Sequence, residues 1–284
     1  MPSSIPDFVG HRHRWPARFV LVALVAVVAL VAGCGGGGGS APDGDPFPLA
    51  VGSRWETEIT QSVSSGPALP QPGSREVVGS FTLAGETTWA LELRDAGVRQ
   101  EWYQRSEHAL VRMPTPQDTA LEQAVGPRVM LQLPLVVGAQ WVQVDKQVIT
   151  GDYLDVDGQP LPTRVQARAE VVAQEPVTVP AGSFRNAFRL RYAERQETDV
   201  VPDAYTAWFE QTTTQWLVPG IGVVRSVTES VNHTSLRTHL RTEVLLAYRP
   251  PPAPPLSRGA APCGPTPARP LTRSAAASAA PPGR

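Results

Sequence analysis

Apolar and polar residues alternate with a period of two along most of residues 47–248, and no other feature constrains the fold as strongly. Side chains two residues apart share one face of a β-strand, so this pattern predicts strands with one face towards a core. The series are Trp55-Thr57-Ile59, Val77-Gly79-Phe81-Leu83, Trp89-Leu91-Leu93, Val98-Gln100-Trp102, Val165-Ala167-Ala169-Val171 and Leu236-Thr238-Leu240-Thr242-Val244-Leu246. Turn-forming residues separate them, which predicts an antiparallel sheet.

One segment departs from the alternation and favours a short helix. Thr115 is a suitable N-cap, Pro116 fits the first helical position and Asp118 fits the first turn. The helix would continue over residues 119–125 and end at Gly126-Pro127. One short helix among about ten strands predicts a mainly β fold, in which a curved antiparallel sheet or partly open barrel has the helix over one opening.

The composition changes on both sides of residues 47–248. Residues 34–46 are nearly all Gly, Ser, Pro and Asp, which indicates a flexible tether. Residues 249–284 are rich in Pro, Ala and Arg and contain no aromatic residue and no acid. Such a tail cannot bury enough surface to offset its ordering entropy, so we expect it to be disordered.

Residues 1–33 have the organisation of a signal peptide. A net basic segment, 1–18, precedes an uninterrupted apolar run from Phe19 to Ala32, and small residues follow. The alternative is a transmembrane helix, which needs about 20 apolar residues. The apolar run is shorter than that, and it ends at a row of glycines that begins at Gly33 and is interrupted only by Cys34.

Val31-Ala32-Gly33-Cys34 resembles the lipobox of bacterial lipoproteins, whose cysteine is acylated, with palmitate for example, and becomes the mature N-terminus. The resemblance implies a lipid at Cys34 and an anchor in the bacterial cell envelope. In Gram-negative lipoproteins an Asp after the cysteine retains the protein in the inner membrane. Gly35 occupies that place, which implies the outer membrane, facing the periplasm. An acylated Cys34 also leaves Cys263 without an intramolecular disulfide partner.

Charge is distributed unevenly along the chain. The formal net charge of −1 combines +2 in residues 1–33 and +5 in residues 249–284, which leaves −8 for residues 34–248. An acidic domain argues against nucleic-acid binding, which needs a basic face. The cationic tail could contact anionic lipid, a cell-wall polymer or its own domain, or it could simply be solvated.

The mature chain contains no familiar catalytic or metal-binding spacing. His233 and His239 would lie on one face of a strand about 20 Å apart, too far to share a metal. Residues 155–158 look faintly like a calcium loop, but Tyr153 and Arg164 occupy two of its ligand positions, so an ordinary Asx turn is the simpler interpretation. We therefore expect no catalytic residue, no metal and no cofactor, and an envelope hydrolase is the least favoured function.

Aromatic residues are the remaining candidates for a binding site. The mature chain has six tryptophans: Trp55, Trp89, Trp102, Trp141, Trp208 and Trp216. The simpler interpretation is that they form the core, since aromatic side chains dominate burial energetics. The alternative is that some line a cavity for an acyl chain or another apolar ligand. The candidate ligand-binding residues are Trp102, Trp208 and Phe209.

A nine-residue segment occurs twice, at 47–55 and again 86 positions later at 133–141, with Pro, Leu, Val, Gly and Trp identical. Proline favours an extended approach, glycine permits a sharp bend, and tryptophan can enter the core. Two copies predict two similar halves of the sheet, each opening with the same corner.

These motifs resemble an uncharacterised group of bacterial envelope lipoproteins with a repeated PLxVGxxW motif, a VxVPAGxF segment and a WxxPGxGxV segment. The last two correspond here to Val177–Phe184 and Trp216–Val223. Such domains are similar to LolA/LolB-like half-barrels, antiparallel sheets curved around an apolar cavity. No established activity comes with the group, so the resemblance assigns no functional residue.

Together, these features predict a non-enzymatic, membrane-anchored lipoprotein that binds an apolar ligand or an envelope partner in a curved β-sheet. The alternative is a structural or assembly lipoprotein whose sheet edge and basic tail engage a protein or polymer of the envelope.

Overall fold

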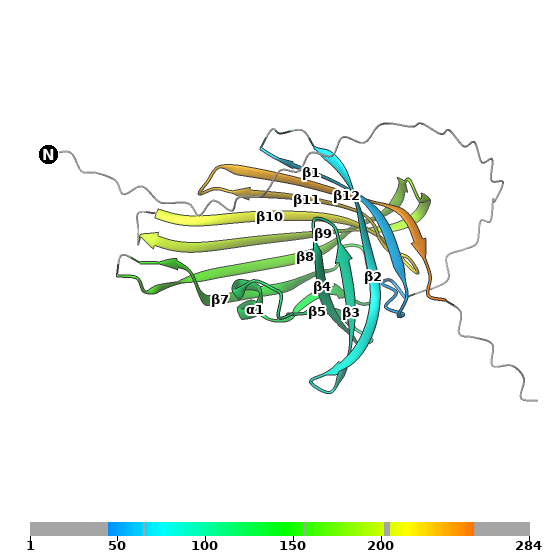
Figure 1. Cartoon of the computed structure of the whole chain (residues 1–284), viewed down its shortest axis with the longest axis horizontal. Helices are drawn as coiled ribbons and strands as arrows, with labels where there is room; N and C mark the ends of the chain where they lie inside the picture. Colours follow the sequence, from blue (N-terminus) through cyan, green and yellow to red (C-terminus); the bar gives the residue numbers. More distant parts are fainter. Residues whose placement is uncertain (1–44, 65, 67, 156, 202–204, 253–284) are drawn as a thin grey trace, which may run out of the picture. The chain divides into compact units, whose positions relative to one another are not determined.

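The computed structural model describes residues 45–252, with the exception of 65, 67, 156 and 202–204. The expected signal peptide, Cys34, almost all of the tether, and Cys263 with most of the tail lie outside the described residues. The described chain forms one twelve-stranded antiparallel sheet, curved into a nearly closed barrel, and one short helix (Figure 1). The predicted fold class is therefore confirmed. No helix of the described part is long and apolar enough to cross a membrane.

The strands follow one another along the chain with one interruption by the helix. They are β1 (Arg54–Val63), β2 (Leu69–Leu83), β3 (Glu86–Arg94), β4 (Val98–Arg105), β5 (Ala109–Met113), β6 (Arg128–Gln132), β7 (Gln140–Leu154), β8 (Pro160–Val179), β9 (Gly182–Val201), β10 (Tyr205–Val218), β11 (Gly222–Asn232) and β12 (Arg237–Arg249), with α1 (Ala120–Val125) between β5 and β6. Their order in the sheet is β6-β5-β4-β3-β2-β1-β12-β11-β10-β9-β8-β7. The strands β1–β6 and β7–β12 thus form two halves with the same internal order, joined through β1 and β12.

The repeated sequence motif makes the same corner in both halves. The Gly52 amide donates to the Val77 carbonyl over 2.8 Å, and the Gly138 amide donates to the Val171 carbonyl over the same distance. In each case the valine amide donates back to the residue after the glycine. Both glycines have a positive φ, 91° and 89°, a conformation that favours glycine. The two halves therefore open with equivalent corners, as the sequence predicts.

The two junctions between the halves differ. At the first junction, β1 pairs with β12 along its whole length, from Arg54 to Val63. At the second, β6 and β7 are the two ends of the sheet order, with no backbone ladder between them within the described residues. Here the Val129 carbonyl accepts hydrogen bonds from the Trp141 indole, over 2.8 Å, and from the Gln143 amide, over 3.0 Å. Side chains rather than paired strands therefore close the barrel on this side.

The helix α1 begins four residues later than the sequence predicts. Its N-cap is Thr119, whose hydroxyl accepts from the Glu122 amide while the Glu122 carboxylate accepts from the Thr119 amide. This reciprocal capping box satisfies two backbone donors at once, so the helix starts here. Thr115 and Asp118 form a separate turn, in which the Asp118 amide donates to the Thr115 carbonyl over 3.1 Å. The predicted end, at Gly126, is correct.

The helix α1 covers the inner side of β7 and β8. Leu121 and Val125 pack there against a small cluster formed by Val144, Val148, Val165 and Ala167. The only lysine of the chain, Lys146, donates from its ammonium to the Val125 carbonyl over 2.6 Å, at the end of the helix. A cation at a helix C-terminus is favourable in general, because the unpaired carbonyls there carry partial negative charge.

The main core lies where β2–β5 cross one half of the long strands β8–β12 (Figure 1). The predicted inward faces of β1, β3 and β8 are correct, as shown by buried Trp55, Leu91 and Val171. In β2 the alternation changes phase, because a bulge follows Val77 and leaves Phe81 exposed.

The predicted inward faces of β4 and β12 are wrong. In β4 the buried residue is Tyr103, so Trp102 points to the other side of the sheet. In β12 the buried residues are Glu243 and Leu245, the latter only 1% exposed, whereas Leu236, just before the strand, is 83% exposed and Leu240 is also exposed. The inward positions of these strands carry polar and charged side chains, so hydrophobic alternation selects the wrong face.

Candidate functional site

The register of the ladders identifies the side chains that share the inner face of the long strands. Directly paired residues of an antiparallel ladder point to the same side. The row that starts at buried Tyr192 continues through Thr213, Thr228 and Arg241. The two adjacent rows follow in the same way, and Gln196 comes from the next row, opposite Phe209. We call this set the inner polar face: Glu194, Gln196, Gln211, Thr213, Gln215, Ser226, Thr228, Ser230, His239, Arg241 and Glu243.

Much of the hydrogen-bonding capacity of the inner polar face is unused. The side chains of Gln211, Gln215, Ser226 and Ser230 make no hydrogen bond to the described part of the chain. All of them are partly or largely buried. None of their polar atoms is among the fully buried, unpaired side-chain atoms of the described residues, so solvent reaches them and they are available to water or to a ligand. They lie in neighbouring strands, β10 and β11, on one continuous surface.

The charged members of the inner polar face are paired. Glu243 accepts from the Arg75 guanidinium over 2.6 Å, and Arg241 lies 3.0 Å from the Asp95 carboxylate and 3.6 Å from that of Glu243. Burial alone would raise the pKa of Glu243, but the neighbouring guanidinium groups, Arg75 first, outweigh it and hold the pKa below its usual range. The pKa of Asp95 is lowered for the same reason. Its partial burial would raise the pKa, but the hydrogen bond from Arg241 and the charges of Arg99 and Arg241 lower it by more.

The opposite wall, from β2 and β4, contributes a second layer of this network. The Tyr103 hydroxyl donates to the Glu101 carboxylate over 2.7 Å. Burial raises the pKa of Tyr103 well above its usual value, and the charge of Glu101 raises it further. Burial would lower the pKa of Arg75, but Glu243 and Glu101 more than compensate, so the pKa is raised and the guanidinium stays charged.

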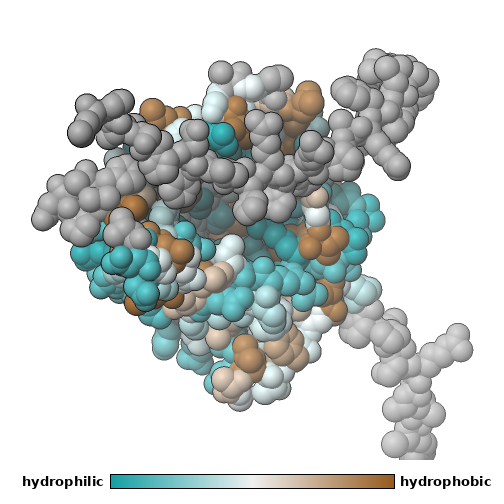
Figure 2. Space-filling view, turned by 60° about the vertical axis from the view of Figure 1, so that its left-hand side comes forward, coloured by the Kyte–Doolittle hydropathy of each residue, from teal (hydrophilic) through white to brown (hydrophobic). Residues whose placement is uncertain are grey.

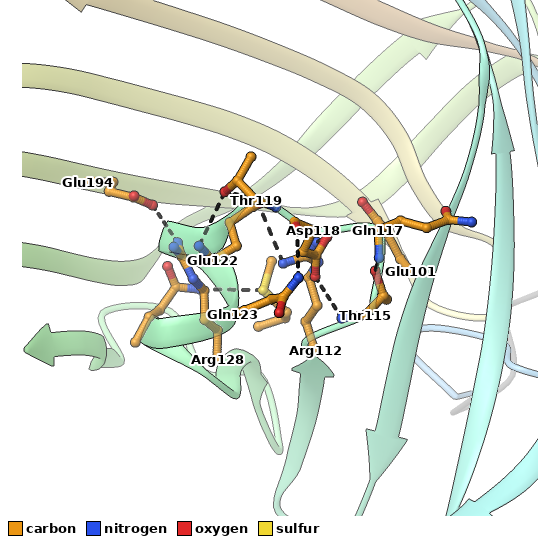
Figure 3. Close-up of polar contacts among 12 residues, drawn as sticks. Glu101, Arg112, Thr115, Gln117, Asp118, Thr119, Glu122, Gln123, Arg128 and Glu194 are labelled. Atoms are coloured by element: carbon orange, nitrogen blue, oxygen red, sulfur yellow. Dashed lines mark hydrogen bonds and ion pairs between the residues drawn. The ribbon is translucent and has the colours of Figure 1, made fainter. Parts of the chain in front are cut away.

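Two more ion pairs attach the segment around α1 to the barrel (Figure 3). Arg112 on β5 lies 2.7 Å from the Asp118 carboxylate, and Arg128 on β6 lies 2.5 Å from the Glu194 carboxylate on β9. The pKa of Arg112 is raised, because Glu101 and other nearby acceptors outweigh the effect of burial. The interior therefore holds many charges, and each guanidinium of the network faces a carboxylate.

The structure places Trp102 on the outer face of β4. Its ring meets that of Phe81 edge to face, with 5.0 Å between centroids. The adjacent Tyr103 points into the core, so the two neighbours are on opposite sides of the sheet. Trp102 is thus separated from the inner polar face.

Trp208 and Phe209 also point to opposite faces of their strand. Trp208 is outward, stacked on the His233 ring at 3.4 Å between centroids and beneath the Arg195 guanidinium at 4.7 Å. Phe209 is inward, paired across the sheet with Gln196. Of the three candidate ligand-binding residues, only Phe209 therefore borders the inner polar face, and the structure does not bring the three together.

The sequence contains a signal for the inner polar face that the search for aromatic residues passes over. In β10 the polar residues Gln211, Thr213 and Gln215 are separated by further polar residues, and in β11 Ser226, Thr228 and Ser230 follow one another at every second position. Series of amides and hydroxyls such as these normally indicate the solvent face of a sheet. The register shows that these two series face the interior instead.

The outer face of β7–β10 has shallow hollows of its own. Two of them, of about 410 and 320 Å³, are neighbours that share Arg168 and Ala193. Charged residues such as Arg168 and apolar residues such as Ala193 both contribute to their lining. Figure 2 shows hydrophilic residues over much of the middle of the view, with hydrophobic residues in separate patches nearer the rim.

Within the described residues, no group of three or more His, Cys, Asp or Glu side chains could hold a metal ion.

No protein-family model and no curated protein matches the chain. Two solved structures are similar. One is a candidate lipoprotein from Parabacteroides distasonis, 14% identical, with a TM-score of 0.38; the match covers 72% of this chain and 99% of that one. The other is a candidate exported protein with YmcC-like fold from Bacteroides fragilis, 15% identical, with a TM-score of 0.37; the match covers 73% of this chain and 100% of that one.

Proposed function

We propose that the described domain is a non-catalytic binding domain of a lipid-anchored protein of the bacterial envelope, and that the inner polar face is its contact surface. One observation carries this proposal. Amide and hydroxyl groups on adjacent strands, partly or largely buried, have no protein partner and share one continuous surface. Such groups gain free energy when a ligand satisfies them.

Binding fits the chemistry of this face better than catalysis. A general acid or base works best when its pKa lies near the working pH. The pKa values of Glu243 and Asp95 are lowered, so both carboxylates stay ionised in their ion pairs. His239, opposite Ser230 in the ladder, is the one imidazole of the face. The other available groups, such as Gln211 and Ser230, are neutral amides and hydroxyls. These groups orient a ligand by hydrogen bonds and do not exchange protons with it.

The same groups favour a polar ligand over the apolar one that the sequence suggests. An acyl chain placed against Gln211 and Gln215 would cover their amides without pairing them. Each buried polar group left in this way costs about 1–3 kcal/mol. A partner strand at the sheet edge has less support, because the Val129 carbonyl of the end strand β6 is already engaged by Trp141 and Gln143.

The anchor at Cys34 is the second part of the proposal, and its support is the lipobox-like sequence before that cysteine. Replacement of Cys34 by Ala, or treatment with globomycin, should leave an unlipidated or unprocessed form with altered migration. Replacement of Gly35 by Asp should move the protein from the outer to the inner membrane fraction. Unchanged fractionation in all of these experiments would exclude the anchor.

The binding surface is tested by site-specific photo-crosslinking in intact cells. A photoreactive amino acid at position 211 faces the interior, whereas the same amino acid at position 214 faces outward on the same strand. We expect a covalent adduct from position 211 and none from position 214. Absence of an adduct from 211 and also from 230 would rule out the inner polar face as a contact surface.

A further inference from the structure

We propose that the ligand of the inner polar face is an uncharged, hydroxyl-rich carbohydrate chain. The inference rests on the proposed function and specifies the chemical class of ligand for the same surface. The side chains of Gln211, Gln215, Ser226 and Ser230, which make no hydrogen bond to the described part of the chain, are called the free groups here. Three properties of the surface support the inference: its charge balance, the ability of the free groups both to donate and to accept hydrogen bonds, and its regular spacing.

The charge balance favours an uncharged ligand. Three guanidinium groups around the free groups already face a carboxylate: Arg75 faces Glu243, Arg241 faces Asp95, and Arg128 faces Glu194 on the inner polar face. A fourth, Arg237, is exposed at the margin opposite Asn232 and makes no ion pair with the described residues. A phosphate or carboxylate ligand in the middle of the face would have to displace one of the three partners and leave it buried and uncompensated. Truncating one partner of a buried pair is strongly unfavourable for the same reason.

The free groups both donate and accept hydrogen bonds. The amides of Gln211 and Gln215 each offer an oxygen acceptor and an N–H₂ donor, and the hydroxyls of Ser226 and Ser230 can do either. Sugar hydroxyls have the same dual character, so each can donate to one of these groups and accept from another. A site built in this way strongly rejects analogues that lack the hydroxyls.

The groups are arranged as a lattice. Neighbouring strands lie about 4.8 Å apart, and side chains on one face repeat about every 6.7 Å along a strand. The inner polar face continues this lattice over β9, β10, β11 and β12 without a bulge between Phe209 and Gln215. A repeating polymer can use such a regular array, and the Phe209 ring at its margin offers an apolar surface for the C–H face of a sugar.

A peptide ligand is less compatible with this surface. Extended peptides bind mainly by adding a strand to a free sheet edge, where main-chain hydrogen bonds supply affinity. The strands β10 and β11 are paired on both sides, so their main-chain groups are occupied. They offer a ligand their side chains alone.

The composition of the cross-linked adduct tests the inference. The full lipidated chain with the photoreactive amino acid at position 211 is irradiated in cells, purified and hydrolysed, and its neutral sugars, uronic acids, fatty acids and peptides are quantified. The same chain with the photoreactive amino acid at position 214 is the matched control. Because a bulky residue at 211 could disturb folding, a second chain carries it at position 230, and circular dichroism checks all three.

We expect at least tenfold more neutral sugar per mole of protein from position 211 or 230 than from 214. In unlabelled cells, the variant Gln211→Ala with Ser230→Ala should retain at least tenfold less co-purifying sugar than the wild type, whereas Thr214→Ala should retain as much. An adduct made of peptide, fatty acid or acidic polymer would overturn the carbohydrate assignment and leave the binding surface standing. No adduct from 211 or 230 would overturn both.

Discussion

The Arg75 guanidinium donates to the Glu243 carboxylate over 2.6 Å, although the two residues are 168 positions apart in the chain. Arg75 belongs to β2 in the first half of the sheet, and Glu243 belongs to β12 in the second half. Their side chains are 20% and 8% exposed. The pair therefore lies inside the barrel and connects the two halves at the inner polar face, to which Glu243 belongs.

Replacement of Glu243 by Gln should destabilise the protein by about 3–5 kcal/mol, because it leaves the Arg75 guanidinium buried without its carboxylate. Urea unfolding followed by tryptophan fluorescence measures the change. The matched control is Glu170→Gln, since Glu170 pairs with Arg191 on the outer face at 3.8 Å. An exposed pair of that kind contributes about 0–1 kcal/mol. Equal losses from the two variants would contradict the interior role of Glu243.

The same pair predicts a pH dependence of stability. The pKa of Glu243 is lower in the folded protein than in the unfolded chain, where a Glu titrates near pH 4.3. The stability due to this carboxylate is complete above the unfolded value and is lost as the pH falls through the folded one. The free energy of unfolding should therefore fall more between pH 6 and pH 3 in the wild type than in Glu243→Gln. Parallel pH curves for the two proteins would refute this.

Comparison of individual strands shows where the local sequence is sufficient to identify the buried face. In β3 and β8 the inner face packs against the apolar core, so alternation alone identifies the buried residues Leu91 and Val171. In β12 the inward residues are Glu243, Arg241 and His239, and the alternating leucines point outward. Their true orientation depends on pairing with β1 and β11, and that pairing comes from the whole sheet rather than from the segment.

The candidate site was less predictable for the same reason. Trp208 and Phe209 are adjacent in sequence, and period-two geometry already requires that they face opposite sides of a strand. The amides and hydroxyls of β10 and β11 have the pattern of a solvent face. Only the closure of the sheet, with β2–β5 crossing over one half of the long strands, turns that face inward (Figure 1).

Loss of the helix cap should loosen α1 selectively. Replacement of Thr119 by Ala removes the hydroxyl that accepts from the Glu122 amide. Loss of an N-cap costs about 1 kcal/mol in general. Hydrogen exchange followed by mass spectrometry should show faster exchange in Ala120–Val125, with the long strands unaffected. Thr119→Ser keeps the capping oxygen and should exchange like the wild type. Slower or unchanged exchange in the Ala variant would show that packing alone holds the helix.

Replacement of Trp141 by Phe should weaken the junction between β6 and β7. The change keeps an aromatic ring but removes the donor to the Val129 carbonyl, a loss of about 1 kcal/mol. Because no described backbone ladder supports this junction, amide exchange should accelerate in β6 and α1. The matched control is Trp55→Phe, at the equivalent position of the other half, where the indole donates to the Ile221 carbonyl. That variant loses a similar hydrogen bond, but the β1–β12 ladder remains, so exchange in β1 and β12 should stay slow. Equal acceleration at both junctions would contradict the prediction, because it would show that the β1–β12 ladder gives its junction no additional protection.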